Sequence, residues 1–227
     1  MDPATEPGVV HLKLGWWQEE MQRLKEGSPV HPISRYLAAL PRAAAVDFTP
    51  LLRAVQAAAV QVSGVPLERG AELEPLAQAL WGEPLALVSR LAADLPDETA
   101  LCNCTKALAA ADYLSKAIRD YRREARVGRV PFPIDELLEA GVENADLAAE
   151  SPPPRLQGYL GRSRDAAAGY FEAAAQALPR ALRSRHRHLL VLAALGRRHL
   201  IGRTPLPERR RLKDMLLAWT TARRAQQ

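Results

Sequence analysis

The sequence is short of cysteine and of aromatic residues. Its 227 residues include two cysteines, Cys102 and Cys104, and only 5% are aromatic. A single C-x-C pair lacks the second ligand pair of a zinc site, so we expect free thiols, buried or half-buried, in a reducing cytoplasm. The sequence also lacks an apolar run long enough to span a membrane. Its first ten residues have neither the basic start nor the apolar core of a signal peptide, so none is expected.

Alanine and leucine dominate the apolar residues, and both favour helices. No β-branched stretch alternates with polar residues, so strands are not expected. The length suffices for one sizeable core, and we predict an all-α, single-domain helical bundle over residues 1–227. The prolines of residues 127–153 predict an irregular segment. Glycine and proline positions predict helices at residues 8–26, 31–40, 47–63, 69–93, 97–126, 152–178, 180–202 and 205–225.

Residues 105–138 carry the spacing that most suggests chemistry. Asp112, Lys116, Asp120 and Glu124 recur every four residues and form one polar stripe along a helix. Two carboxylates one turn apart can share a Mg²⁺ ion. Spacing alone nevertheless favours a solvated, ion-paired face, because such pairs are common on exposed helices. The other side of the helix is apolar, at Leu101, Cys104, Leu108, Ala111, Leu114, Ile118, Tyr121 and Ala125.

Two segments resemble the squalene and phytoene synthase family. The first is similar to that family's second aspartate-rich motif and the turn after it, through Arg119, Asp120, Glu124, Gly128, Arg129, Pro133, Asp135 and Leu137. The second is similar to the family's Trp-Trp helix and the loop that follows it, through Leu14, Gly15, Trp16, Trp17, Gln18, Glu19, Glu20, Gly27, Pro29, His31 and Pro32. Both segments occur in the family's order, and together they anchor the resemblance from about residue 10 to about residue 180.

The resemblance implies an isoprenoid synthase fold and a prenyltransferase that joins two allylic diphosphates, such as farnesyl or geranylgeranyl diphosphate, head to head. In that family Mg²⁺ links aspartates to the diphosphate, and an apolar cavity shields the allylic cation from water. The implied residues are Asp120 and Glu124 as metal ligands, Lys116, Arg119 and Arg129 as diphosphate contacts, and Trp16, Trp17 and Tyr113 as pocket candidates.

The tryptophan pair also has an ordinary structural interpretation. Trp17 belongs to an apolar series with alternating spacings of four and three, which is typical of one buried helix face. An aromatic residue in such a series is more often core than the wall of a ligand pocket, so we favour core packing. The series consists of Val10, Leu14, Trp17, Met21 and Leu24.

The sequence departs from the family pattern at its chemical positions. The family's first aspartate-rich motif precedes the Trp-Trp helix, but residues 1–9 contain no Asp-x-x-x-Asp, so we expect a fold that lacks the N-terminal helices. Lys116 replaces the family's Asn, Tyr113 replaces its Gln, and Glu124 replaces its second Asp. A cation at Lys116 can pair with Asp120 and repel Mg²⁺.

These departures favour a non-catalytic homologue with an eroded diphosphate site, which binds a prenyl lipid or a partner protein without a cofactor. The alternative is an active enzyme of squalene- or phytoene-type isoprenoid biosynthesis, for which Mg²⁺ would be the cofactor. Both interpretations predict a prenyl diphosphate or prenyl lipid as a ligand.

The C-terminal part is strongly basic. From Arg180 onward, 12 Arg and 1 Lys face 2 acidic residues, a net charge of +11. Such a surface can meet an anionic membrane, a protein partner or a diphosphate, whereas nucleic acid is not expected because interleaved aromatic residues are missing. We therefore predict a cytoplasmic protein, with peripheral attachment to the inner membrane as an open alternative. We expect the apolar side of the last helix either to dock on the core or to lie against a membrane. This side consists of Leu206, Leu212, Met215, Leu216 and Trp219.

Overall fold

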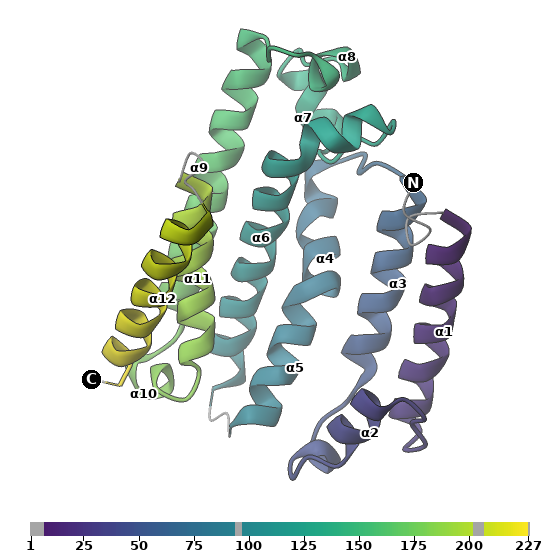
Figure 1. Cartoon of the computed structure of the whole chain (residues 1–227), viewed down its shortest axis with the longest axis vertical. Coiled ribbons are helices and arrows are strands. Elements are labelled where there is room, and N and C mark those ends of the chain that lie inside the picture. The colour runs from purple at the N-terminus through teal and green to yellow at the C-terminus, as the bar shows by residue number, and fades with distance from the viewer. Residues whose placement is uncertain (1–6, 94–96, 202–206, 227) are drawn as a thin grey trace.

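The computed structural model describes residues 7–93, 97–201 and 207–226. Within these ranges the chain is helical and contains no strand, which confirms the all-α prediction. Figure 1 shows long helices lying side by side, with α1 and α3 at one edge, α6 in the middle and α12 at the other edge. No helix in these ranges is long and apolar enough to cross a membrane.

The helices follow the predicted order closely. All eight predicted segments correspond to observed helices, and most boundaries differ by one or two residues. The α-helices are α1 (Pro7–Lys25), α2 (Pro32–Ala38), α3 (Thr49–Ser63), α4 (Leu73–Ala77), α5 (Glu83–Ala92), α6 (Glu98–Arg126), α7 (Ile134–Glu139), α8 (Asn144–Ala148), α9 (Pro154–Ala177), α10 (Arg180–Arg183), α11 (Arg187–Ile201) and α12 (Pro207–Arg224). Short η2 (Ala43–Ala45) and η3 (Gly70–Glu72) turns and a π turn, η4 (Gln78–Gly82), complete the set.

Helix α6 is the central element of the bundle. The side chain of Asp97 caps its first turn by accepting a hydrogen bond from the Ala100 backbone N–H at 3.0 Å. Its predicted apolar face is buried or packs on buried clusters, and α9 and α11 cover part of it. Cys104 is buried and Cys102 is half-buried, and both are free thiols as expected. Burial raises the pKa of Cys104 to about 12, so its thiol stays protonated.

Residues 127–153 are more ordered than the sequence predicts. The prediction of an irregular segment is wrong in part, because α7 and α8 form inside it. Pro133 lies just before α7, where the ring favours a helix start and removes no internal hydrogen bond. Asp146 and Glu143 form a reciprocal capping box at the start of α8. Phe132 is fully buried beneath these turns and anchors them to α6 and α9.

Two predicted helices are interrupted. The segment 69–93 changes to a π turn at η4, where Gly82 lies close to α6. A Cβ at Gly82 would overlap the Gln78 side chain and lie 3.2 Å from the Thr105 carbonyl oxygen, so a larger residue there requires Gln78 to move. The segment 180–202 breaks after α10, and the turn that follows buries His186 completely. Periodicity does not report such breaks, because the apolar positions continue on both sides.

The later part of the apolar series of α1 packs as predicted, whereas Val10 and Leu14 are half-buried. Met21 and Leu24 are buried in a cluster with residues of α3 and α5, and Trp17 packs against that cluster. Trp17 also contacts the ring of His31 edge to face, with centroids 5.0 Å apart. The structure therefore supports the core interpretation of Trp17.

A close contact between α9 and α11 yields a test of the packing. Gly196 of α11 faces Phe171 of α9, and a Cβ there would overlap the buried ring. We expect Gly196→Ala to destabilise the fold by about 1–2 kcal/mol, since overpacking outweighs the helix gain from alanine. Gly169→Ala is the control, because nothing lies within 4 Å of that position. Urea unfolding of both variants measures the difference, and equal stabilities would contradict the contact.

Candidate functional site

A cavity of about 460 Å³ lies between α3, η4 and α6. We call it the α3–α6 cavity. One side is mainly apolar and comes from α3, the following loop, α4 and η4, with Gln61 and Glu72 as its polar members. The other side is polar and comes from α6 and the turn after it. The cavity gathers five of the eight residues that the sequence singled out: Tyr113, Lys116, Asp120, Glu124 and Arg129.

The turn after α6 explains how Arg129 reaches this cavity. Gly128 has a φ of +75°, a left-handed conformation that glycine adopts without strain. This turn lets the Arg129 backbone N–H donate to the Glu124 carbonyl oxygen at 3.0 Å. The Arg129 guanidinium then lies 3.5 Å from the Glu124 carboxylate and 3.4 Å from the Val62 carbonyl oxygen. The Gly-Arg landmark therefore folds a cation back onto the wall of the cavity.

The two α6 carboxylates of the cavity, Asp120 and Glu124, are paired with arginines, and a third wall carboxylate, Glu72, lies 3.4 Å from Arg69. Asp120 accepts two hydrogen bonds from Arg119, at 3.2 and 2.8 Å, and lies 3.5 Å from Arg123. Glu124 lies 3.1 Å from Arg123 and 3.5 Å from Arg129. The hydrogen bond from Arg119 lowers the pKa of Asp120, and nearby cations act in the same direction. Both carboxylates therefore serve ion pairs in this structure.

Lys116 has a different partner from the predicted one. Its Nζ atom forms an ion pair with Asp112, one turn earlier in the helix, at 2.7 Å. The predicted pair with Asp120 does not form. It also lies 4.3 Å from the centre of the Trp81 ring, a cation–π contact. Asp120 is already occupied by Arg119, which explains why Lys116 turns towards Asp112. Burial raises the pKa of Tyr113, so its hydroxyl remains a neutral lining group.

This donor set does not fit a Mg²⁺ site. Magnesium is held through oxygen ligands in octahedral geometry, and arginines here occupy the oxygens of both carboxylates. No group of three or more His, Cys, Asp or Glu side chains is placed to hold a metal ion in the part of the chain that the structure describes. The two acids are thus ion-paired wall residues as the structure shows them.

Three predicted residues lie outside the cavity wall. Arg119 is largely exposed and forms an ion pair with Asp120, but it does not line the cavity. Trp16 is exposed on α1, and Trp17 packs in the α1 cluster, so neither lines the α3–α6 cavity. The wall residues that sequence reasoning did not assign to the site include Arg123 and Trp81. Arg123 could have been found from its place one turn after Asp120, whereas no spacing signal connects Trp81 with α6.

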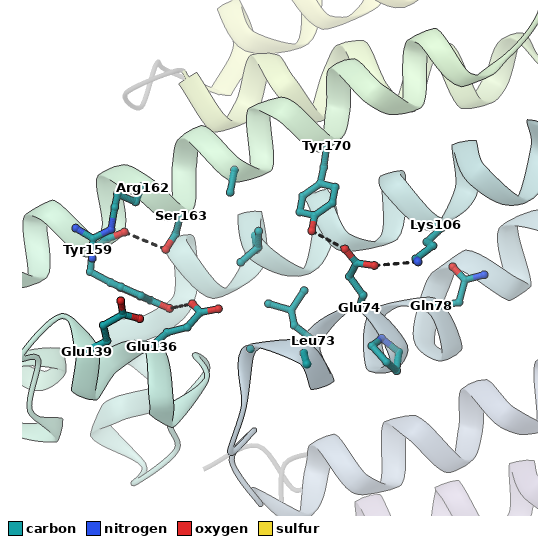
Figure 2. Close-up of a pocket in the computed structure, with 15 residues that line it drawn as sticks. Leu73, Glu74, Gln78, Lys106, Glu136, Glu139, Tyr159, Arg162, Ser163 and Tyr170 are labelled. Carbon is teal, nitrogen blue, oxygen red and sulfur yellow. Dashed lines mark hydrogen bonds and ion pairs between the residues drawn. The ribbon is translucent and has the colours of Figure 1, made fainter.

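A second cavity, of about 1160 Å³, lies between α4, α6, α7 and α9. Several of its polar groups pair with one another, as Figure 2 shows. Glu74 accepts a hydrogen bond from the Tyr170 hydroxyl at 2.7 Å and lies 3.0 Å from Lys106. The Tyr159 hydroxyl donates to Glu136 at 2.9 Å. We call it the α4–α9 cavity; none of the sequence-predicted site residues lines it.

The hydrogen bonds of the α4–α9 cavity fix its charge states. The Tyr170 hydroxyl lowers the pKa of Glu74, and Lys106 adds to this effect. Burial, together with Glu74, raises the pKa of Tyr170 to about 12. Glu74 is therefore ionised and Tyr170 neutral near pH 7, and their hydrogen bond connects α4 to α9.

We take the α3–α6 cavity as the candidate site because its cations and its apolar wall lie together.

Comparisons with known proteins agree with this fold. The model of the squalene/phytoene synthase family matches residues 1–203. A squalene synthase, HpnC from Alicyclobacillus acidocaldarius, superposes with a TM-score of 0.71 at 19% identity, over 90% of this chain and 74% of that chain. A dehydrosqualene synthase solved with a ligand superposes with a TM-score of 0.73 at 16% identity, over 97% of this chain and 80% of that chain. No curated protein matches the chain.

Proposed function

Because the chain belongs to the squalene/phytoene synthase family, we propose that it binds a prenyl diphosphate or a related prenyl lipid in the α3–α6 cavity without converting it. Three cations, Lys116, Arg123 and Arg129, lie on the polar side of that cavity. Guanidinium and ammonium groups are the donors that bind phosphate oxygens most strongly. They would hold the diphosphate at this side of the cavity.

The opposite wall suits an isoprenoid chain. It carries mainly aliphatic side chains from α3, the following loop, α4 and η4, together with Trp81, Gln61 and Glu72. An apolar chain gains free energy when such a wall removes it from water, at roughly 25 cal/mol per Å² of apolar surface. Trp81 joins the apolar side to the polar side, because Lys116 lies over its ring. An amphiphile with one anionic end therefore matches the cavity better than a wholly polar or wholly apolar ligand.

The proposal that the ligand is bound without being converted rests on one observation: the carboxylates of Asp120 and Glu124 are both paired with arginines. Asp120 and Glu124 together have Arg119, Arg123 and Arg129 within 3.5 Å. An arginine that holds a carboxylate competes with a metal for the same oxygens. The proposed ligand is accordingly bound through cations of the protein, with no need for Mg²⁺.

One observation favours the alternative, an active head-to-head prenyltransferase. Asp120 and Glu124 both line the cavity one turn apart, as two ligands of a shared metal would. That function requires further oxygen ligands besides these two, because Mg²⁺ is bound by six. The alternative also requires Arg119, Arg123 and Arg129 to release their carboxylates.

Binding and turnover of farnesyl diphosphate separate the two functions. We expect calorimetry to show binding that is as strong in EDTA as in Mg²⁺, and labelled farnesyl diphosphate to release no diphosphate. Asp120→Ala should keep the binding, because it removes an anion from the cavity wall. Release of diphosphate that requires Mg²⁺ and disappears in Asp120→Ala would replace this proposal with the enzyme. Absence of any binding would reject both.

A further inference from the structure

The less exposed side of α12 carries Asp214, the half-buried Leu217 and several small residues. Its Asp214 lies 3.4 Å from Arg198 and 2.9 Å from His199, both on α11. Ala225, directly after α12, is buried. The apolar side of α12 was expected to dock on the core or to lie against a membrane, and the structure shows that it does not dock on the core. Leu206, which the sequence assigns to the same side, lies outside the described residues.

The outward side of α12 is apolar instead. Leu212, Met215, Leu216 and Trp219 are 70%, 68%, 61% and 57% exposed. They follow the spacing i, i+3, i+4 and i+7, so they form a single stripe over two helical turns. Scattered exposed apolar residues are normal in proteins, but a continuous stripe of large ones marks an interaction surface.

The charge around this stripe is positive. The sequence of α12 has six basic residues against two acidic ones, a net charge of +4. Lys213 and Arg223 are exposed beside the stripe, and Arg223 lies 5.1 Å from the centre of the Trp219 ring. Asp214 is committed to α11, so no acidic side chain is exposed among residues 212–226. The surface thus combines apolar side chains with uncompensated cations.

We propose that α12 lies flat on an anionic lipid bilayer. In this arrangement the four apolar side chains enter the boundary between headgroups and acyl chains, while Lys213 and Arg223 meet lipid phosphates. Trp219 suits this depth because its ring is apolar and its N–H is polar. The membrane site is independent of the α3–α6 cavity, since α12 contributes no residue to that cavity.

A second copy of the chain fits this surface less well. A twofold contact places the same patch on both partners, so the cations of one α12 would face those of the other. No exposed acid of residues 212–226 is available to pair with them. An anionic bilayer supplies both the apolar depth and the opposite charge, which a second copy does not.

Vesicle flotation with the full chain tests the proposal. We expect flotation with vesicles of phosphatidylcholine and phosphatidylglycerol at low salt, but not with pure phosphatidylcholine. High salt should weaken binding, because it screens exposed charges. The double substitution Leu216→Ser with Trp219→Ser should weaken binding at least tenfold, because two apolar side chains no longer enter the bilayer. The pair Lys213→Gln with Arg223→Gln should weaken it by about fivefold per charge.

Two control variants outside α12 test whether loss of any exposed apolar or basic side chain weakens vesicle binding. Leu138→Ser removes an apolar side chain that is 72% exposed on α7, and Arg69→Gln removes a cation that is 75% exposed before η3. Both should float like the unmodified protein, and circular dichroism should show that every variant is folded. No flotation with anionic vesicles, or equal flotation of the α12 and control variants, would overturn the proposal. A dimer in sedimentation that the α12 serines abolish, without vesicle binding, would assign the stripe to a second copy.

Discussion

Lys116→Glu is expected to weaken the binding of farnesyl diphosphate by roughly 100-fold, the largest effect on binding that we anticipate. The Lys116 ammonium lies at the α3–α6 cavity, between the Trp81 ring and the half-exposed Asp112. Its replacement removes a charge-assisted contact to the diphosphate and adds a carboxylate between Asp112 and Asp120. The cavity wall would then carry three acids along α6, at positions 116, 120 and 124, separated by one turn each.

The chain offers a closely matched control for this variant. Lys106 lies on the same helix, is 54% exposed where Lys116 is 41% exposed, and lies 3.0 Å from its own partner, Glu74. It lines the α4–α9 cavity and not the candidate site. Calorimetry should therefore show that Lys106→Glu binds farnesyl diphosphate within about twofold of the unmodified protein. Equal losses in both variants would indicate a general charge effect, and no loss in either would place the ligand elsewhere.

Helix periodicity made most of the fold predictable. The apolar series of α6 and α1 are long, so they specify a buried face without knowledge of the neighbours. Residues 127–153 were harder, because the stability of α7 and α8 depends on Phe132, which packs on side chains of α6 and α9. Such short helices depend on tertiary contacts more than on their own sequence.

The candidate site was predictable where its residues share one helix. Tyr113, Lys116, Asp120 and Glu124 line the same cavity because the helical repeat fixes their relative positions. Trp81 reaches the site through the π turn η4, whose extra residue alters the direction of side chains in a way that spacing does not show.

The choice of ion-pair partners was not predictable from spacing. Lys116 has an acid one turn away on each side, and the sequence cannot rank Asp112 against Asp120. The adjacent Arg119 donates two hydrogen bonds to Asp120, which leaves Asp112 as the partner of Lys116.

The orientation of α12 could not be predicted for a similar reason. Its apolar stripe has the usual pattern of a buried face, but Asp214 and its partners on α11 hold the opposite side inward.

Glu20→Ala is expected to lower the melting temperature by roughly 10 °C, the largest effect on stability that we anticipate. The Glu20 side chain is fully buried in α1 and accepts hydrogen bonds from the backbone N–H groups of Val30 and His31, at 3.0 and 2.8 Å. It also accepts one from Arg23 at 2.9 Å. Alanine would leave these donors without partners and release the loop that joins α1 to α2. Glu19→Ala is the control, because Glu19 is 72% exposed beside it.

The same carboxylate predicts a specific pH dependence. Burial alone would raise the pKa of Glu20, but the hydrogen bonds from His31 and Arg23 outweigh it and hold the pKa at about 2, against 4.5 for an unperturbed glutamate. A folded-state pKa below the unfolded value means that the ionised group stabilises the protein above pH 4.5 and loses this effect as the pH falls towards 2. Thermal melts of the unmodified protein and Glu20→Gln should therefore differ most near pH 7 and converge progressively as the pH falls from 4.5 towards 2. A difference that stays constant with pH would show that Glu20 acts through packing alone and not through its charge.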